Sequence, residues 1–204
     1  MMMDVRWWSA QRPARGEEVC GDAVVVVEDA GKILVAVADG LGHGPRAAAA
    51  AEGFCGAVQR HGSLALSELM QRGAEAVVGT RGAVAALMSI DIRNGEGSFL
   101  GVGNIDVRAL AQPPISVVSR PGIVGRRLPV QAQQQFRVEV GAIIALFSDG
   151  VSGRLQLRDY MALPTAEWPE RILEKHGKGE DDATCIVLRV GENGRGVGRA
   201  PGLV

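Results

Sequence analysis

The sequence has few of the residues that define several common protein classes. Only three of its 204 residues are cysteines, Cys20, Cys55 and Cys185, and no two form a CxxC pair. An odd number of widely spaced cysteines argues against a disulfide framework or a zinc knuckle and predicts buried thiols in a reducing compartment. Aromatic residues make up 4% of the chain, so its 47% hydrophobic content must form a core of Val, Ala, Leu and Ile.

An excess of either charge is also missing. The chain balances 22 basic against 23 acidic residues, which leaves no field to attract nucleic acid or an anionic membrane. No apolar run approaches the ~20 residues needed to cross a bilayer. The first eight residues also lack the apolar region of a signal peptide. We therefore expect a cytoplasmic protein with no nucleic-acid partner and no membrane partner.

Apolar runs and turn residues divide the chain into blocks of strands and helices. Strands are expected at 23–27, 33–38, 83–92, 97–103, 106–110, 115–119, 136–140, 142–148 and 183–190, and helices at 45–60, 63–78 and 166–177. The first two strands are continuous apolar runs, which predicts burial on both faces. Ser63 is the expected N-cap of the second helix.

The order of these blocks predicts the fold class. Strands come in groups with helices clustered between them, which favours an α+β fold over βαβ alternation. Two packed antiparallel sheets with helices outside would bury the apolar strands as their composition requires. We expect one domain at residues 1–190 and a flexible C-terminal tail at residues 191–204.

The sequence does contain a set of aspartates placed where apolar runs begin or end. Asp22 and the Asp181-Asp182 pair stand just before such runs, whereas Asp39 and Asp149 stand just after them. A carboxylate at the end of a buried strand is poorly solvated unless something compensates its charge. Four such placements, far apart in sequence, indicate one shared compensator. Mg²⁺ and Mn²⁺ take oxygen ligands of this kind.

Each placement alone has a plainer explanation. The Asp-Gly pairs at 39–40 and 149–150 are compatible with ordinary turns, and Asp181-Asp182 with a solvated acidic turn. Glycine after an aspartate, however, lets the backbone approach an ion, so the Gly40 carbonyl is a candidate ligand. Strand alternation turns the two adjacent aspartates to opposite sides, so only one of them is expected to ligate.

Four motifs contain these aspartates, in the order Gly21-Asp22, Asp39-Gly40-Leu41-Gly42-His43-Gly44, Phe147-Ser148-Asp149-Gly150-Val151 and Asp181-Asp182-Ala183-Thr184. Taken in this order, they resemble the metal-binding motifs of the PP2C-type Ser/Thr protein phosphatases. The similarity is closest to the short bacterial SpoIIE-like branch, and the stretch 101–108 resembles the RsbX-like stressosome phosphatases. It covers roughly residues 15–190. This resemblance implies an αββα sandwich with two Mn²⁺ or Mg²⁺ ions at one edge of the sheets.

The resemblance also implies roles for individual residues. Asp39 would bridge both ions, and the Gly40 carbonyl would bind one of them. Asp22 would bind on the other side, and Asp149 and Asp181 would hold the first ion.

Two further candidates come from the same motifs. Asp182 completes the candidate metal set, at a position that is more often supportive than ligating. His43 has three possible roles: general acid for the leaving serine or threonine oxygen, support for the site, or metal ligand.

The implied activity is hydrolysis of a phosphorylated protein by a metal-activated water. The chain offers no cysteine in a phosphate-binding loop and no evident Ser-His-Asp trio, which agrees with direct attack by water. The resemblance implies phosphoserine or phosphothreonine on a STAS-domain stressosome protein as the substrate. The alternatives are a catalytically inactive adaptor that binds phosphoproteins, which would have lost a core aspartate, and a hydrolase of small phosphoesters.

Overall fold

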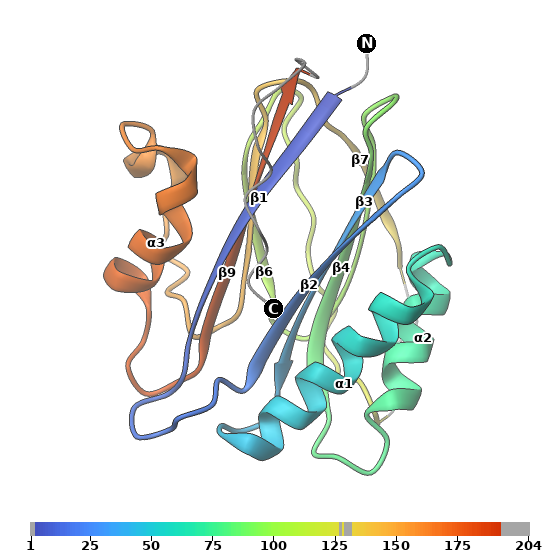
Figure 1. Cartoon of the computed structure of the whole chain (residues 1–204), viewed down its shortest axis with the longest axis vertical. Helices are drawn as coiled ribbons and strands as arrows, with labels where there is room; N and C mark the ends of the chain where they lie inside the picture. Colours follow the sequence, from blue (N-terminus) through green and yellow to red (C-terminus); the bar gives the residue numbers. More distant parts are fainter. Residues whose placement is uncertain (1–2, 127, 129–131, 193–204) are drawn as a thin grey trace.

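The computed structural model describes residues 3–126, 128 and 132–192, and it shows two antiparallel sheets packed face to face between helices (Figure 1). In the four-stranded sheet the order is β1 (Met3–Arg12), β9 (Ala183–Glu192), β8 (Ile143–Phe147) and β6 (Asp106–Leu110). In the five-stranded sheet the order is β2 (Asp22–Asp29), β3 (Lys32–Gly40), β4 (Ala83–Asp91), β5 (Glu96–Val102) and β7 (Gln134–Arg137). The predicted α+β sandwich is confirmed.

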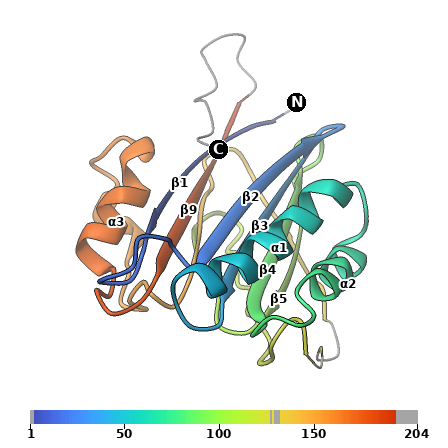
Figure 2. The same ribbon diagram turned by 60° about the horizontal axis from the view of Figure 1, so that its bottom comes forward.

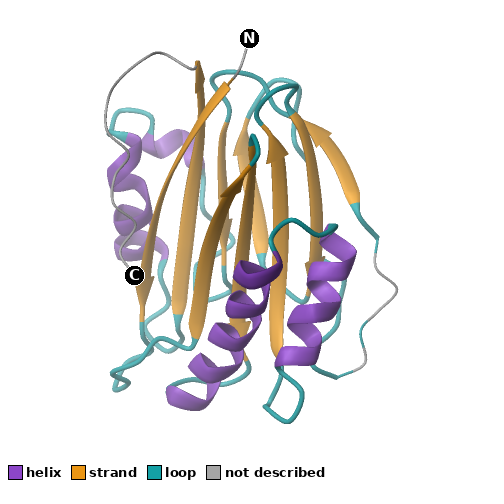
Figure 3. Cartoon of the chain, turned by 45° about the vertical axis from the view of Figure 1, so that its right-hand side comes forward, coloured by secondary structure: helices purple, strands orange, loops and turns teal. Residues whose placement is uncertain are grey.

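Helices cover the outer face of each sheet. The five-stranded sheet carries α1 (Pro45–His61) and α2 (Leu66–Ala76), which lie side by side in Figure 3. The four-stranded sheet carries α3 (Trp168–His176), preceded by the short 3₁₀ helices η1 (Leu157–Tyr160) and η2 (Thr165–Glu167). The molecule therefore has four layers, in the order helix, sheet, sheet, helix.

Strand β3 shows why its residues must be apolar on both sides. Ile33, Val35 and Val37 belong to the core between the two sheets, whereas Leu34 and Ala36 belong to the core beneath α1 and α2. Side chains alternate along a strand, so a central strand between two cores needs a continuous apolar run. The prediction of burial on both faces is confirmed for this strand.

The same prediction holds only in part for β2, whose valines contact the cores on both faces but are only half-buried. β2 is the edge strand of the five-stranded sheet and pairs with β3 alone. The N-terminal strand β1 was not predicted at all, because charged residues interrupt its apolar pattern. It pairs with β9 along its whole length, and Trp7 packs against the core between the sheets.

The strand predicted at 115–119 does not form. The nearest backbone bridge is made by the following residue, Arg120, which pairs with Val102. The side chain of Gln134 takes the place of a neighbouring strand. Its Nε2 donates a hydrogen bond of 2.7 Å to the Val118 carbonyl, and its Oε1 accepts one of 3.0 Å from the Val118 N–H. With both backbone groups of Val118 bonded to a side chain, no strand ladder continues here.

Other boundaries move by a few residues. α2 begins at Leu66 rather than Ser63, because the Glu68 carboxylate accepts from the Ala65 N–H at 3.3 Å and fixes the start of the helix there. The strand predicted at 136–140 lies at 134–137. Residues 191–192 extend β9, and the rest of the predicted tail, 193–204, lies outside the described residues.

Candidate functional site

The hairpin of β2 and β3 sets two carboxylates opposite each other. Asp22 is the register partner of Asp39, at the end of the hairpin away from its turn. Directly paired residues share one face of a sheet, and alternation from Val37 puts both side chains on the face toward the other sheet. Like charges in this position repel, so this edge requires a counter-charge or a proton.

The four-stranded sheet brings two more carboxylates to the same edge. Asp149 follows β8 and Asp181 precedes β9, its antiparallel neighbour, so the two lie at the same end of that sheet. Figure 2 turns this end of the molecule forward. An open hollow of about 250 Å³ is lined by residues from both sheets: Asp39, Leu41, Gly42, His43, Val84, Asn104, Asp149 and Asp181.

Asp22 lies behind this hollow and is 4% exposed. Its Oδ2 accepts a hydrogen bond of 2.6 Å from the Ser148 hydroxyl, whose oxygen in turn accepts from the Thr184 N–H at 3.0 Å. Its Oδ1 is buried and has no hydrogen-bond partner in the described part of the chain. Ser148 thus ties a carboxylate of one sheet to the other sheet.

Asp182 is also buried, but it is not among the residues that line the hollow. Its Oδ1 accepts from the Ala14 N–H at 2.9 Å, and its Oδ2 is a second buried oxygen without a partner among the described residues. The adjacent Asp181 is the one that faces the hollow. The structure therefore places the pair on different sides, with Asp182 anchoring the loop that follows β1.

Burial and mutual repulsion shift the titration of these groups. The pKa of Asp39 is raised to about 8, chiefly by burial, then by the charge of Asp22, with smaller effects of the other aspartates of the site. Burial raises the pKa of Asp22 to about 7, although the hydrogen bond from Ser148 opposes the shift. Partial burial and the charge of Asp149 raise the pKa of Asp181. The site therefore favours either protons or a cation.

The chemistry of these donors fits a hard divalent cation. In the described ranges, no three His, Cys, Asp or Glu side chains already enclose a single point as ion ligands would. The fit rests on the oxygen donors gathered at one edge and on the partnerless Oδ1 of Asp22 and Oδ2 of Asp182. A buried carboxylate oxygen without a partner is costly, and Mg²⁺ or Mn²⁺ would supply one.

Gly40 allows β3 to approach α1 very closely. A Cβ at this position would lie 2.0 Å from the carbonyl oxygen of Ala47 in α1. The Gly40 N–H donates to the Gly21 carbonyl at 3.1 Å, which joins the end of β3 to the residue before β2. The backbone at Asp39 and Gly40 is thereby fixed between the hairpin and α1.

His43 reaches the hollow from the loop between β3 and α1. Its Nδ1 lies 2.5 Å from Oε1 of Glu17, which belongs to the loop between β1 and β2. The side chain of His43 is 63% exposed and that of Glu17 is 27% exposed. The pair joins the β1–β2 loop to the loop between β3 and α1.

Three residues at this edge were missed by reasoning from the sequence. Asn104 donates from Nδ2 to Oδ2 of Asp149 at 2.6 Å. Arg81 lies over Gly42, where a Cβ would be 2.5 Å from its Nη1, and it forms no ion pair with any described residue. Glu17 is the third. Only Asn104 stood in a motif, the stretch 101–108; single charged residues in loops carry no such signal.

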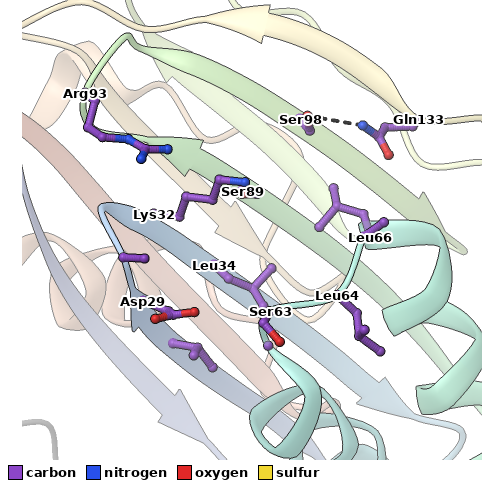
Figure 4. Close-up of a pocket in the computed structure, with 14 residues that line it drawn as sticks. Asp29, Lys32, Leu34, Ser63, Leu64, Leu66, Ser89, Arg93, Ser98 and Gln133 are labelled. Carbon is purple, nitrogen blue, oxygen red and sulfur yellow. Dashed lines mark hydrogen bonds between the residues drawn. The ribbon is translucent and has the colours of Figure 1, made fainter.

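A second hollow, of about 390 Å³, lies at the opposite end of the five-stranded sheet, beside the β2–β3 turn (Figure 4). Leu34, Leu64 and Leu66 line it together with Lys32, and Asp29 is the single carboxylate among its lining residues. It lacks the converging carboxylates, so we assign the chemistry to the edge that holds Asp39.

No helix in the described part of the chain has the length and apolar character needed to cross a membrane.

Comparison with known proteins identifies the family. The model of the Stage II sporulation protein E (SpoIIE) family matches residues 29–191. The chain belongs to the SpoIIE family. Phosphoserine phosphatase RsbX of Bacillus subtilis (strain 168) is 29% identical over 90 residues, which are 44% of this chain and 45% of RsbX. The matched region thus spans less than half of that relative.

Solved structures of relatives share the fold of this SpoIIE-family chain. A chain from work on the bacterial stressosome, described as a modular system adapted to control secondary messenger signalling, is 34% identical, with a TM-score of 0.87 over 91% of this chain and 100% of that one. RsbX in complex with magnesium is 21% identical, with a TM-score of 0.80 over 92% and 96% of the two chains. The PP2C phosphatase domain of Bacillus subtilis SpoIIE, with a fragment of its regulatory domain, is 20% identical, with a TM-score of 0.76 over 95% and 65%. The last two show the shared fold alone.

Proposed function

We propose that this SpoIIE-family chain is a divalent-metal-dependent protein phosphatase that removes phosphate from phosphoserine or phosphothreonine. The convergence of Asp39, Asp149 and Asp181 on one open hollow carries the proposal. The sequence relative RsbX, a phosphoserine phosphatase, supports the same activity. All the aspartates of the four motifs are present, which speaks against an inactive adaptor.

The proposed cofactor is a pair of Mn²⁺ or Mg²⁺ ions. Asp39 would be shared between them, with the Gly40 carbonyl and Asp22 serving one side and Asp149 and Asp181 the other. The partnerless Oδ1 of Asp22 supports this assignment, as does the magnesium in the solved RsbX complex. Asp182 was a candidate ligand as well; its position behind the hollow favours a supporting role.

The metal ions and the residues around the hollow would have different roles in the reaction. Bound divalent ions would lower the pKa of a water molecule and offset the charge on the phosphoryl oxygens. Asn104 holds Asp149 in place through its 2.6 Å hydrogen bond. His43 also lines the hollow and is proposed to give a proton to the leaving oxygen. The openness of the hollow suits a phosphorylated side chain on a protein surface.

The proposed substrate is a phosphorylated STAS-domain protein of a stressosome-type complex. This part rests on relatives: RsbX, and the similar chain from work on the stressosome. The cytoplasmic location stays a prediction.

Release of phosphate from a phosphorylated STAS-domain protein tests this function. With Mn²⁺ present we expect release, and EDTA or the substitution Asp39→Asn should reduce it to background without loss of the fold. Asp159→Asn serves as the matched control, because Asp159 is an exposed aspartate that contacts Lys175 at 3.5 Å, far from the site in the fold. Full activity of Asp39→Asn would contradict the proposed mechanism.

A further inference from the structure

The loop between β1 and β2 delivers a carboxylate to His43. Oε1 of Glu17 lies 2.5 Å from Nδ1 of His43, a short contact for a nitrogen donor and a carboxylate acceptor. The two residues are 26 positions apart and belong to different loops. Their contact is therefore a product of the tertiary fold and not of local sequence.

Both oxygens of the Glu17 carboxylate have a defined place. A Cβ on Gly44 would lie 2.4 Å from Oε2, so the carboxylate fills the space that glycine leaves open. Gly44 has a positive φ of 71° and is the residue before α1, whose own N-cap provides no side-chain hydrogen bond. A carboxylate beside the first turn of a helix is also favoured by the helix dipole.

Three hydrogen bonds hold the backbone around Glu17. The Glu17 N–H donates to the Ala14 carbonyl at 3.0 Å, and the Arg15 N–H donates to the Gly179 carbonyl at 3.0 Å. The Ala14 N–H donates to Oδ1 of Asp182. The loop that carries Glu17 is thus tied to the segment that carries Asp181, and both are fixed relative to the hollow.

A carboxylate on Nδ1 determines what the other ring nitrogen of His43 can do. It favours the tautomer that carries its proton on Nδ1, and it restrains rotation of the ring. Nε2 makes no hydrogen bond with any described residue, and the ring lines the hollow beside Asp39 and Asp149. Nε2 is therefore the atom left for the substrate.

We propose that Glu17 is a positioning residue that orients His43 for proton transfer to the leaving oxygen of the phosphorylated residue. The inference rests on the proposed phosphatase function. The ring acts in its doubly protonated form. As the bond between phosphorus and the serine oxygen breaks, its electron pair stays on that oxygen, which takes the proton from Nε2 and leaves the ring neutral with its remaining proton on Nδ1, beside Glu17. The proton that the attacking water gives up returns the ring to its doubly protonated form.

Leaving groups of different basicity separate this role from a structural one. A serine alkoxide needs a proton as it leaves, whereas the 4-nitrophenolate of 4-nitrophenyl phosphate leaves without one. Proton transfer contributes about 10²–10⁴-fold to rate, so Glu17→Gln should lower kcat on a phosphoserine protein by about 10-fold or more. The same variant should change kcat on 4-nitrophenyl phosphate by less than about 3-fold. A residue that merely caps α1 would slow both reactions alike.

Two comparisons sharpen the experiment. Glu18→Gln, at the exposed neighbouring residue of the same loop, should leave both rates unchanged. His43→Asn should show the same substrate-dependent loss as Glu17→Gln, and the double variant should be no slower than His43→Asn alone, because the two residues act as a unit. Equal losses on both substrates, or no loss on either, would overturn the inference.

A spectroscopic readout does not depend on activity. The ¹⁵N shifts of the His43 ring, recorded where the ring is neutral, should report the proton on Nδ1, and Glu17→Gln should shift the population toward Nε2. A ring protonated mainly on Nε2 in the unaltered protein would also overturn the inference. If the unaltered protein hydrolyses neither substrate with Mn²⁺, the proposed function fails, while the ring measurement still shows whether Glu17 orients His43.

Discussion

At the scale of single residues, the site depends on a glycine, Gly40, which has no side chain. Gly40 follows Asp39, and its Cα faces the Ala47 carbonyl at a distance that leaves no room for a methyl group. Any substitution must push α1 away from β3 or bend the end of β3. Either movement would also displace the Asp39 carboxylate.

Gly40→Ala is therefore expected to lower the free energy of unfolding by about 1–3 kcal/mol, the usual cost of overpacking. The matched control is Gly53→Ala within α1, where the nearest atom to the new Cβ is 3.5 Å away. A helix interior favours Ala over Gly by about 0.5–1 kcal/mol, so the control should gain stability. Urea unfolding of both variants measures the difference, and equal stabilities would contradict the close approach described here.

The acidic half of the site could be predicted from the sequence, whereas its polar supports could not. Asp22 stands directly before an apolar run, and Asp39 and Asp149 directly after one, so their positions in the sequence identify them. Asn104 and Glu17 stand in loops where polar residues are ordinary. Their roles depend on which loops meet, and that follows from the packing of two sheets rather than from any local pattern.

At the scale of elements, one side chain replaces a strand. Gln134, the first residue of β7, bonds to both backbone groups of Val118 and so holds the segment after Pro114 against the sheet. The apolar content of residues 115–119 predicted a strand. An apolar run alone does not show whether a segment pairs with a strand or is held against the sheet by a side-chain amide.

Gln134→Ala should release residues 115–119 from the sheet. The free energy of unfolding should fall by only about 0.5–1.5 kcal/mol, because the lost hydrogen bonds are partly exposed. The specific expectation is faster amide hydrogen exchange at Val118, with exchange in β8 unchanged. Gln133→Ala is the matched control, because among the described residues its amide forms a hydrogen bond with the Ser98 hydroxyl alone. Unchanged exchange at Val118 would show that other contacts hold the segment.

Central elements were easier to predict than edges. β3, β4 and β8 have apolar runs that nearly match the observed strands, because each lies between two other strands and has both faces packed against protein. β1 and β2 are edge strands with one neighbour each. An edge strand tolerates charges on its open side, so the pattern of β1 did not indicate a strand.

At the scale of the whole molecule, the carboxylates link stability to pH. The pKa values of Asp22 and Asp39 are raised from 3.8 to about 7 and about 8. A carboxyl group whose pKa is higher in the folded state binds more protons when folded, so its contribution to stability is complete below pH 3.8 and is lost as pH rises to about 8. The pKa of Asp91 is lowered to about 2, so its contribution to stability is lost only as the pH falls below 3.8, outside this range.

In EDTA, the melting temperature is therefore expected to fall steadily between about pH 5 and pH 8. Mn²⁺ should restore it most strongly at the upper end, where the carboxylates are ionised and the cation does not compete with protons. The double variant Asp22→Asn/Asp39→Asn should flatten the profile and abolish the effect of Mn²⁺. A profile that rises with pH in EDTA would contradict the burial and repulsion assigned to this edge.

The position of β9 has a consequence for how the protein is made. β9 lies between β1 and β8, yet it follows every other described strand in the chain. During translation β1 leaves the ribosome first and must wait, unpaired, until nearly all of the described chain has emerged. Asp181, just before β9, arrives at the same late moment. A nascent chain therefore lacks one carboxylate of the proposed metal site until β9 is about to emerge.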